Sequence, residues 1–163
     1  MVTQQYTRDE IMDHLSAIVD PEIPVLTIQE IGMLRDVLIT EKGYEIILTP
    51  TYTGCPAMGI IEEDIERLLA EKGVGPVSVK LVYAPAWTTD WMTDEAKEKM
   101  RRYGISPPEH SSCNQIFSLS SSVKCPRCGS DNTDLISRFG ATACKALYKC
   151  NNCKEPFEYF KCH

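Results

Sequence analysis

The sequence predicts an α+β fold: a small domain with the element order αββαβα, whose helices pack on one sheet, followed by a short cysteine-rich module. Two segments repeat apolar residues at helical spacing, a third and more charged segment also favours a helix, and three shorter ones are rich in strand-forming residues. The last forty residues hold two Cys-x-x-Cys pairs. A chain of 163 residues has room for one ordinary domain and one such module.

Local start and stop signals delimit the expected helices. Thr7 and Glu10 form a capping-box pattern at the start of the first helix, and two prolines follow its end. Gly73 and Gly104 end the second and the third helix. These signals predict helices at 7–19, 57–72 and 93–103. Strand-forming residues predict strands at 34–40, 44–49 and 77–83, the first two of which form a hairpin.

The composition of the chain changes after residue 105. Two adjacent prolines and a run of serines lie in the following segment, which is typical of a linker. We therefore expect an α+β domain at 1–105, a Ser- and Pro-containing linker at 106–123 and the cysteine-rich module at 124–163.

Charge is divided unevenly along the chain. Residues 124–163 hold seven Lys/Arg and four Asp/Glu, a balance of +3, so the preceding part carries −9 of a net charge of −6. This acidic main body argues against nucleic acid as the principal partner, because phosphate binding depends on clustered basic side chains. Partner proteins fit this charge balance better.

Whether the cysteines form disulfides depends on the compartment in which the protein resides. The apolar runs are too short to cross a membrane, and the N-terminus lacks the basic-then-apolar pattern of a secretory signal. These features predict a cytoplasmic protein, in which thiols stay reduced. The eight cysteines are then expected to be metal ligands or reactive thiols rather than disulfides.

Two Cys-x-x-Cys knuckles dominate the C-terminal module. They are separated by 21 residues, which is marginally longer than the usual zinc-ribbon spacing and easily absorbed by the loop between them. Each knuckle can occupy two corners of a tetrahedron, so the pattern predicts a structural zinc site. Four buried structural cysteines or two redox pairs are the alternatives, and iron also accepts four thiolates. The expected ligands are Cys125, Cys128, Cys150 and Cys153.

The remaining cysteines of the C-terminal half are less informative. Cys144, Cys162 and His163 would supply a secondary metal site, or Cys144 simply packs within the ribbon while the other two form a frayed end. Cys113 is the single cysteine of the linker, and we expect it to have no specific function, although a functional role is the alternative.

The remaining cysteine lies in the first domain, between an expected strand and an expected helix. Pro56 suits the start of a helix, which places Cys55 at or beside the cap, where backbone N–H groups and the helix dipole are expected to lower its pKa. Thr51 and Thr53 add hydroxyl groups to the same loop. A small buried residue beside the helix start is the alternative. Asp20, before Pro21, is by itself more typical of a turn than of a ligand.

These segments together resemble two related families. The sequences Asp-Pro-Glu-Ile-Pro at 20–24, Ile-Gln-Glu-Ile-Gly-Met at 28–33 and Thr-Pro-Thr-Tyr-Thr-Gly-Cys-Pro at 49–56 resemble the DUF59 family associated with iron–sulfur assembly. The cysteine-rich tail, the two-tryptophan segment 84–91 and the ending at 160–163 are similar to the PaaD family. Its members are encoded with the multicomponent phenylacetyl-CoA epoxidase.

The resemblance implies an accessory, non-catalytic role in phenylacetate catabolism. A member of this family is expected to help mature the iron–sulfur or diiron centre of the epoxidase complex, with the iron–sulfur reductase as its main partner and a homodimer as a further association. Carried over by position, Cys55 and Asp20 are the expected ligands of a transient iron ion or cluster, or the site of a reactive thiol. The alternatives are a thiol enzyme that uses Cys55 on a thioester or other electrophile, and a ribbon that binds protein or nucleic acid.

Overall fold

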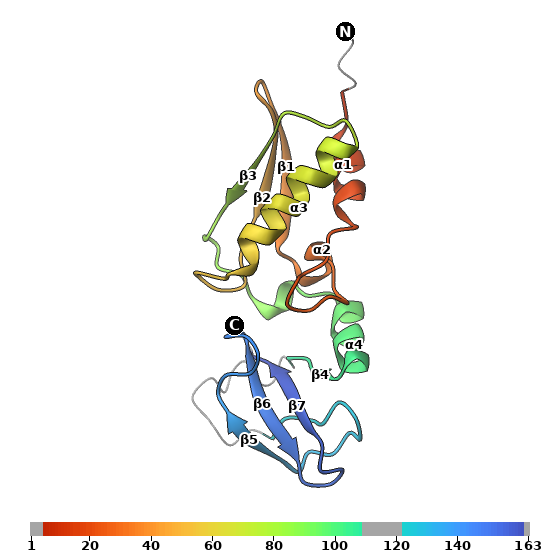
Figure 1. Ribbon diagram of the computed structural model, residues 1–163, viewed down its shortest axis with the longest axis vertical. Coiled ribbons are helices and arrows are strands. Elements are labelled where there is room, and N and C mark those ends of the chain that lie inside the picture. The colour runs from red at the N-terminus through yellow and green to blue at the C-terminus, as the bar shows by residue number, and fades with distance from the viewer. Residues whose placement is uncertain (1–4, 109–121, 162–163) are drawn as a thin grey trace. The chain divides into compact units, whose positions relative to one another are not determined.

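The computed structural model describes residues 5–108 and 122–161 (Figure 1). These residues divide after Trp87 into two compact units. The first unit contains a three-stranded sheet of β1 (Leu34–Thr40), β2 (Gly43–Leu48) and β3 (Val77–Leu81), in that order. Strands β1 and β2 pair antiparallel, as expected of a hairpin, whereas β2 and β3 pair in parallel. A parallel neighbour requires a crossover connection, and a helix provides it here.

Helices cover one face of this sheet (Figure 1). Helix α1 (Arg8–Leu15) packs against β1, and α3 (Ala57–Glu71), the crossover between β2 and β3, packs against β3 and α1. The covered face carries the buried side chains of β2, which alternate along the strand, and α3 contributes an apolar stripe at helical spacing. Together they bury Ile11, Leu15, Tyr44, Ile46, Leu48, Ile61, Ile65 and Leu69. The predicted α+β class is confirmed.

The first helix ends earlier than expected, and a further short helix follows it. Helix α1 stops at Leu15, and Val19 then forms an isolated antiparallel bridge with Thr27. Thr27 caps the four-residue helix α2 (Ile28–Ile31) through a capping box. The segment between them is therefore a closed loop, and Asp20 lies within it.

The second unit combines a helix with a four-stranded sheet. Helix α4 (Asp94–Tyr103) follows the short 3-10 helix η1 (Thr89–Trp91) and leads into β4 (Ile105–Ser106). The sheet order is β4-β7-β6-β5, in which β4 runs parallel to β7 and the other pairs are antiparallel. The three ribbon strands are β5 (Thr133–Ser137), β6 (Lys145–Cys150) and β7 (Pro156–Phe160).

The two units divide after Trp87, earlier in the chain than the boundary expected after residue 105. Helix α4 packs against β4, and β4 pairs with β7, so this helix belongs with the ribbon strands. Ser106, placed in the linker by its composition, is buried in β4 and its hydroxyl donates to the carbonyl of Lys124 at 2.9 Å. Among the residues that the structure describes, no helix has the length and apolar character needed to cross a membrane.

Candidate functional site

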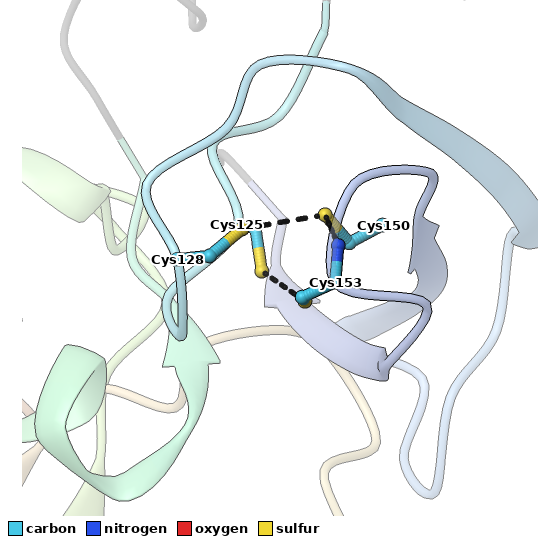
Figure 2. A group of neighbouring side chains, drawn as sticks. All are labelled: Cys125, Cys128, Cys150 and Cys153. Carbon is cyan, nitrogen blue, oxygen red and sulfur yellow. Dashed lines mark hydrogen bonds between the residues drawn. The ribbon is translucent and has the colours of Figure 1, made fainter.

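Four cysteines of the ribbon point their sulfur atoms toward one another (Figure 2). Their Sγ atoms all lie within 4.8 Å of one another. The separation is 3.8 Å between Cys125 and Cys153 and 3.5 Å between Cys128 and Cys150. Cys125 and Cys150 are buried, Cys153 is half-buried and Cys128 is exposed.

Each knuckle is a tight turn that ends on a residue with left-handed backbone. In the first, the N–H of Gly129 donates to the carbonyl of Cys125 at 2.9 Å, and Gly129 has a φ of 75°. Lys154 takes the matching position after the second knuckle with a φ of 68°, where glycine would be less strained. This shared geometry is what presents two sulfurs from each turn to a common centre.

The sulfur geometry fits a tetrahedral thiolate site. Zinc–sulfur bonds of about 2.3 Å imply sulfur–sulfur edges of about 3.8 Å, close to the observed separations. The N–H of Cys153 donates to the Sγ of Cys150 at 3.5 Å, and with the N–H of Asn152 and the neighbouring thiols it outweighs burial and lowers the pKa of Cys150 to about 6. The N–H of Glu155 lowers the pKa of Cys153, but burial and the other three thiols outweigh it and raise that pKa to about 11, so the first proton is lost from the cluster as a whole. Since metals bind the thiolate form, the turn prepares this ligand for an ion.

The secondary metal site remains a prediction. Cys144 is buried near the end of the ribbon loop, with its Sγ 3.0 Å from the Oγ1 of Thr142. Cys113, Cys162 and His163 lie outside the described residues. Within 5–108 and 122–161, the four ribbon cysteines are the only group of three or more Cys, His, Asp or Glu side chains arranged to hold an ion.

The second site of interest lies where β2 gives way to α3. Helix α3 begins at Ala57 with Pro56 in the capping position, so Cys55 precedes the cap by one residue. The N–H of Cys55 donates to the carbonyl of Tyr52 at 3.3 Å, and its own carbonyl accepts from the N–H of Met58. The thiol is buried, with 8% of the residue exposed.

The surroundings of Cys55 raise the pKa of its thiol, so the expected lowering is wrong. Burial is the largest cause, and the negative charges of Glu22 and Asp20 act in the same direction. The N–H of Ala57 and the hydroxyl of Tyr52 both donate to the sulfur and oppose this rise without cancelling it. At neutral pH, Cys55 is therefore a protonated thiol next to two carboxylates.

Asp20 holds the loop between α1 and α2 in shape. Its Oδ1 accepts hydrogen bonds from the N–H groups of Glu22 at 2.7 Å and Ile23 at 2.9 Å, which is the turn-forming role expected for an Asp before proline. The fold also brings Asp20 and Glu22 close enough to Cys55 for their charges to act on its thiol. The structure thus gives Asp20 a turn-forming role and a place in the electrostatic surroundings of the thiol.

Two residues that act on the Cys55 thiol, Tyr52 and Glu22, were not among the site residues expected from the sequence. Thr51 is half-buried and Thr53 exposed, and the hydroxyl that reaches the thiol is instead that of Tyr52. Glu22 acts on the thiol more strongly than Asp20 does. Both residues lie within the motifs that carry the family resemblance, but nothing in their spacing distinguished them from their neighbours.

The raised pKa predicts a slow and strongly pH-dependent alkylation of Cys55. A thiol with a pKa above its ordinary value of 9.0 is less than about 1% thiolate at pH 7, so the rate should rise about tenfold per pH unit up to pH 9. Peptide mapping by mass spectrometry after timed iodoacetamide pulses measures this rate. Glu22→Gln removes one negative charge and should increase the rate at pH 8. A rate that levels off below pH 8 contradicts the raised pKa.

Comparison with known proteins covers both units. The family model of the PaaD zinc beta ribbon domain matches residues 109–161, and that of the iron-sulfur cluster assembly protein matches residues 8–82. A putative 1,2-phenylacetyl-CoA epoxidase subunit of Escherichia coli strain K12 is 54% identical over 153 residues, which is 94% of this chain and 92% of that protein. The chain belongs to the PaaD family.

Other relatives match about the first half of the chain. An Fe-S protein maturation auxiliary factor of Porphyromonas gingivalis is 34% identical over 55% of this chain and 87% of that protein. The crystal structure of a DUF59 domain from Bacillus anthracis has a TM-score of 0.51 at 30% identity, and covers 55% of this chain and 87% of that one. The α+β part is thus shared with the iron–sulfur assembly proteins, and the ribbon is shared with the PaaD family.

Proposed function

We propose that this chain is a maturation factor for the phenylacetyl-CoA epoxidase complex, and that its client is the iron–sulfur reductase of that complex. The relative from Escherichia coli is named as a putative subunit of the epoxidase, and relatives of the α+β part are named as Fe-S protein maturation factors. One chain that combines both similarities is suited to serve one complex. The diiron centre of the complex is the second client considered.

The surroundings of Cys55 carry this proposal. A protonated thiol beside Glu22 and Asp20 is a poor nucleophile, but the same negative charge favours a cation, which displaces the thiol proton as it binds. These three side chains are not a preformed chelate, since within the described part of the chain only the ribbon has such a group. Iron or a cluster held at Cys55 therefore takes further ligands from the client or a second copy, which suits a transient cargo.

Nothing comparable supports an enzyme that uses Cys55 on a thioester. A nucleophilic cysteine needs a base or a depressed pKa, and the pKa of Cys55 is raised. The single histidine of the described residues, His14, lies in α1 and contacts the ring of Tyr6. A raised pKa and nearby negative charge fit a cation-binding role better than a nucleophilic one.

The ribbon has a structural part in this proposal. We assign its ion as zinc, because four thiolates in a closed tetrahedral arrangement are typical of structural zinc sites. Cys125, Cys128, Cys150 and Cys153 would hold it. Bound zinc supplies the cross-link that keeps the two knuckles together.

Iron binding by the purified protein tests the proposal. The full chain, purified without oxygen and incubated with ferrous iron and the apo-reductase, should bind iron in addition to about one zinc per chain. Cys55→Ser should lose the iron and keep the zinc, as elemental analysis and Mössbauer spectroscopy would show. Val74→Ala is the matched control, because Val74 is also buried in the first unit but follows the end of α3 remote from Cys55. Equal iron in the wild type and in Cys55→Ser rules out the role of Cys55.

A further inference from the structure

The loop between β5 and β6, residues 138–144, exposes an unusual amount of apolar surface. Phe139 in this loop is 65% exposed, and Ile136 near the end of β5 is 55% exposed. They are the two most exposed large apolar side chains among the residues that the structure describes. Aromatic side chains that remain in water beside a second apolar residue are typical of binding surfaces.

A buried ion pair holds this loop in one shape. The Nζ of Lys145 lies 3.1 Å from a carboxylate oxygen of Glu158, and the Lys145 side chain is only 5% exposed. The other oxygen of Glu158 accepts from the N–H of Ala141 at 2.7 Å, and the N–H of Gly140 donates to the carbonyl of Lys145. A Cβ at position 140 would lie 2.5 Å from a carboxylate oxygen of Glu158, so a larger residue there would push this carboxylate away from the N–H of Ala141.

The Lys145–Glu158 ion pair is better explained as a device that fixes the conformation of the loop than as a contribution to the stability of the fold. Burying an ion pair gives little net stability, because desolvation offsets the attraction between the charges. A loop that is already ordered loses less conformational entropy when a partner binds. The pair thus fixes an exposed aromatic side chain for recognition.

Two cationic residues accompany the exposed ring, one in contact with it and one adjacent in sequence. The ammonium group of Lys161 lies 4.6 Å from the centre of the Phe139 ring and donates to the carbonyl of Arg138 at 3.0 Å. Arg138 itself is exposed. Glu158, the carboxylate that contacts this loop, is neutralised by Lys145. The loop therefore presents an exposed aromatic ring with one cation against it and a second exposed cation at the preceding residue.

The loop is separated from the metal ligands by the length of a strand. Strand β6 runs from Lys145, beside the loop, to Cys150 in the second knuckle, a span of about 17 Å at about 3.3 Å per residue. Substitutions in the loop therefore leave the ligand set untouched. The metal end holds the ribbon together, while the opposite end is available for contact.

We propose that the loop formed by residues 138–144, with Ile136, is the surface by which this chain binds its client protein. Its complement is an apolar pocket rimmed by carboxylates, into which Phe139 inserts while Arg138 and Lys161 meet the acidic rim. Aromatic and arginine side chains of this kind dominate the binding energy of protein interfaces. The assignment of the client as the reductase rests on the proposed function.

Nucleic acid is a poorer match for the same surface. Two cations neutralise two phosphates, which is too little for binding at physiological salt, and the remainder of the chain is strongly acidic. The Phe139 ring already has Lys161 against one face, so that face is closed to a stacked base. A protein pocket accepts the ring with its cation in place.

Binding to the purified apo-reductase, measured by biolayer interferometry with the full chain, tests the inference. Phe139→Ser should weaken binding at least about tenfold with unchanged zinc content, and Arg138→Glu should weaken it and remove most of its salt dependence. Tyr103→Ser is the matched control, because Tyr103 on α4 is 53% exposed and lies outside the loop, and it should bind as the wild type does. Cys55→Ser should also bind normally, which separates docking from iron transfer.

Several outcomes would overturn the inference. Equal affinity of the wild type and Phe139→Ser, or no binding of the wild type to the reductase, removes the loop as its docking surface. Loss of self-association or of oligonucleotide binding in Phe139→Ser, without loss of reductase binding, assigns the loop to another partner. If the wild type binds the reductase through Phe139 but transfers no iron, the proposed function fails while this inference stands.

Discussion

Serine in place of Cys55 is expected to reduce maturation of the reductase to the level seen without this protein. A serine hydroxyl does not ionise near neutral pH and is a hard ligand, whereas iron and its clusters are held by soft thiolates. The change removes one polarisable atom from a buried position and keeps the backbone hydrogen bonds of the loop. Stability should therefore change by no more than about 1–2 kcal/mol.

The measurement is the cluster content of the client. The reductase is produced in cells that lack the chromosomal copy of this factor, together with the wild type or a variant, and its cluster is quantified by absorbance and electron paramagnetic resonance. Val74→Ala, which shortens a buried side chain of the same unit at the end of α3 remote from Cys55, should support full maturation. A fully loaded reductase in the presence of Cys55→Ser would show that the cysteine has no part in the reaction.

Removal of the ribbon metal, or Cys150→Ser, is expected to unfold the ribbon strands and leave the first unit folded. The buried apolar cluster of the ribbon consists of Val123, Cys125, Cys150 and Phe157, with tyrosines packed around it. Half of this cluster is cysteines that we propose as metal ligands. Structural zinc contributes about 10–16 kcal/mol of apparent binding free energy, which exceeds what so small a core supplies.

Amide spectra from nuclear magnetic resonance would follow this unfolding residue by residue. Addition of a strong chelator should collapse the resonances of β5, β6 and β7, while those of α1, α3 and the first sheet keep their dispersion. The first unit has its own buried core, including Ile46, Ile61 and Ile65, and does not depend on the knuckles. Persistence of dispersed ribbon signals without metal would show that the strands fold by themselves.

Local signals determined most of the secondary structure. The capping box at Thr7 and Glu10 and the proline before α3 act within a few residues, so the expected helix starts match α1 and α3 closely. The same holds for β1, whose bounds agree with the expected strand, Leu34–Thr40. Helix α2 was missed because a four-residue helix contains too little periodicity to detect, although its capping box at Thr27 and Glu30 was a usable signal.

The division into units and the sheet order required the tertiary structure. Helix α4 continues the first domain along the chain, but its packing on β4, and the pairing of β4 with β7, place it in the second unit. A two-residue strand leaves no pattern in the sequence. The Lys145–Glu158 pair also forms only when β6 and β7 lie side by side.

The sequence by itself determined which four cysteines come together in the ribbon and where Cys55 lies relative to α3. Ligand spacing within a tight turn is a property of a few consecutive residues, so the two knuckles could be recognised and their sulfurs do converge. Only the tertiary structure decided the state of the Cys55 thiol. The pKa of this thiol depends on burial and on the charges of Glu22 and Asp20, which belong to a loop more than thirty residues earlier in the chain. These effects outweigh the hydrogen bond from the local N–H group, which was the basis of the sequence-based expectation.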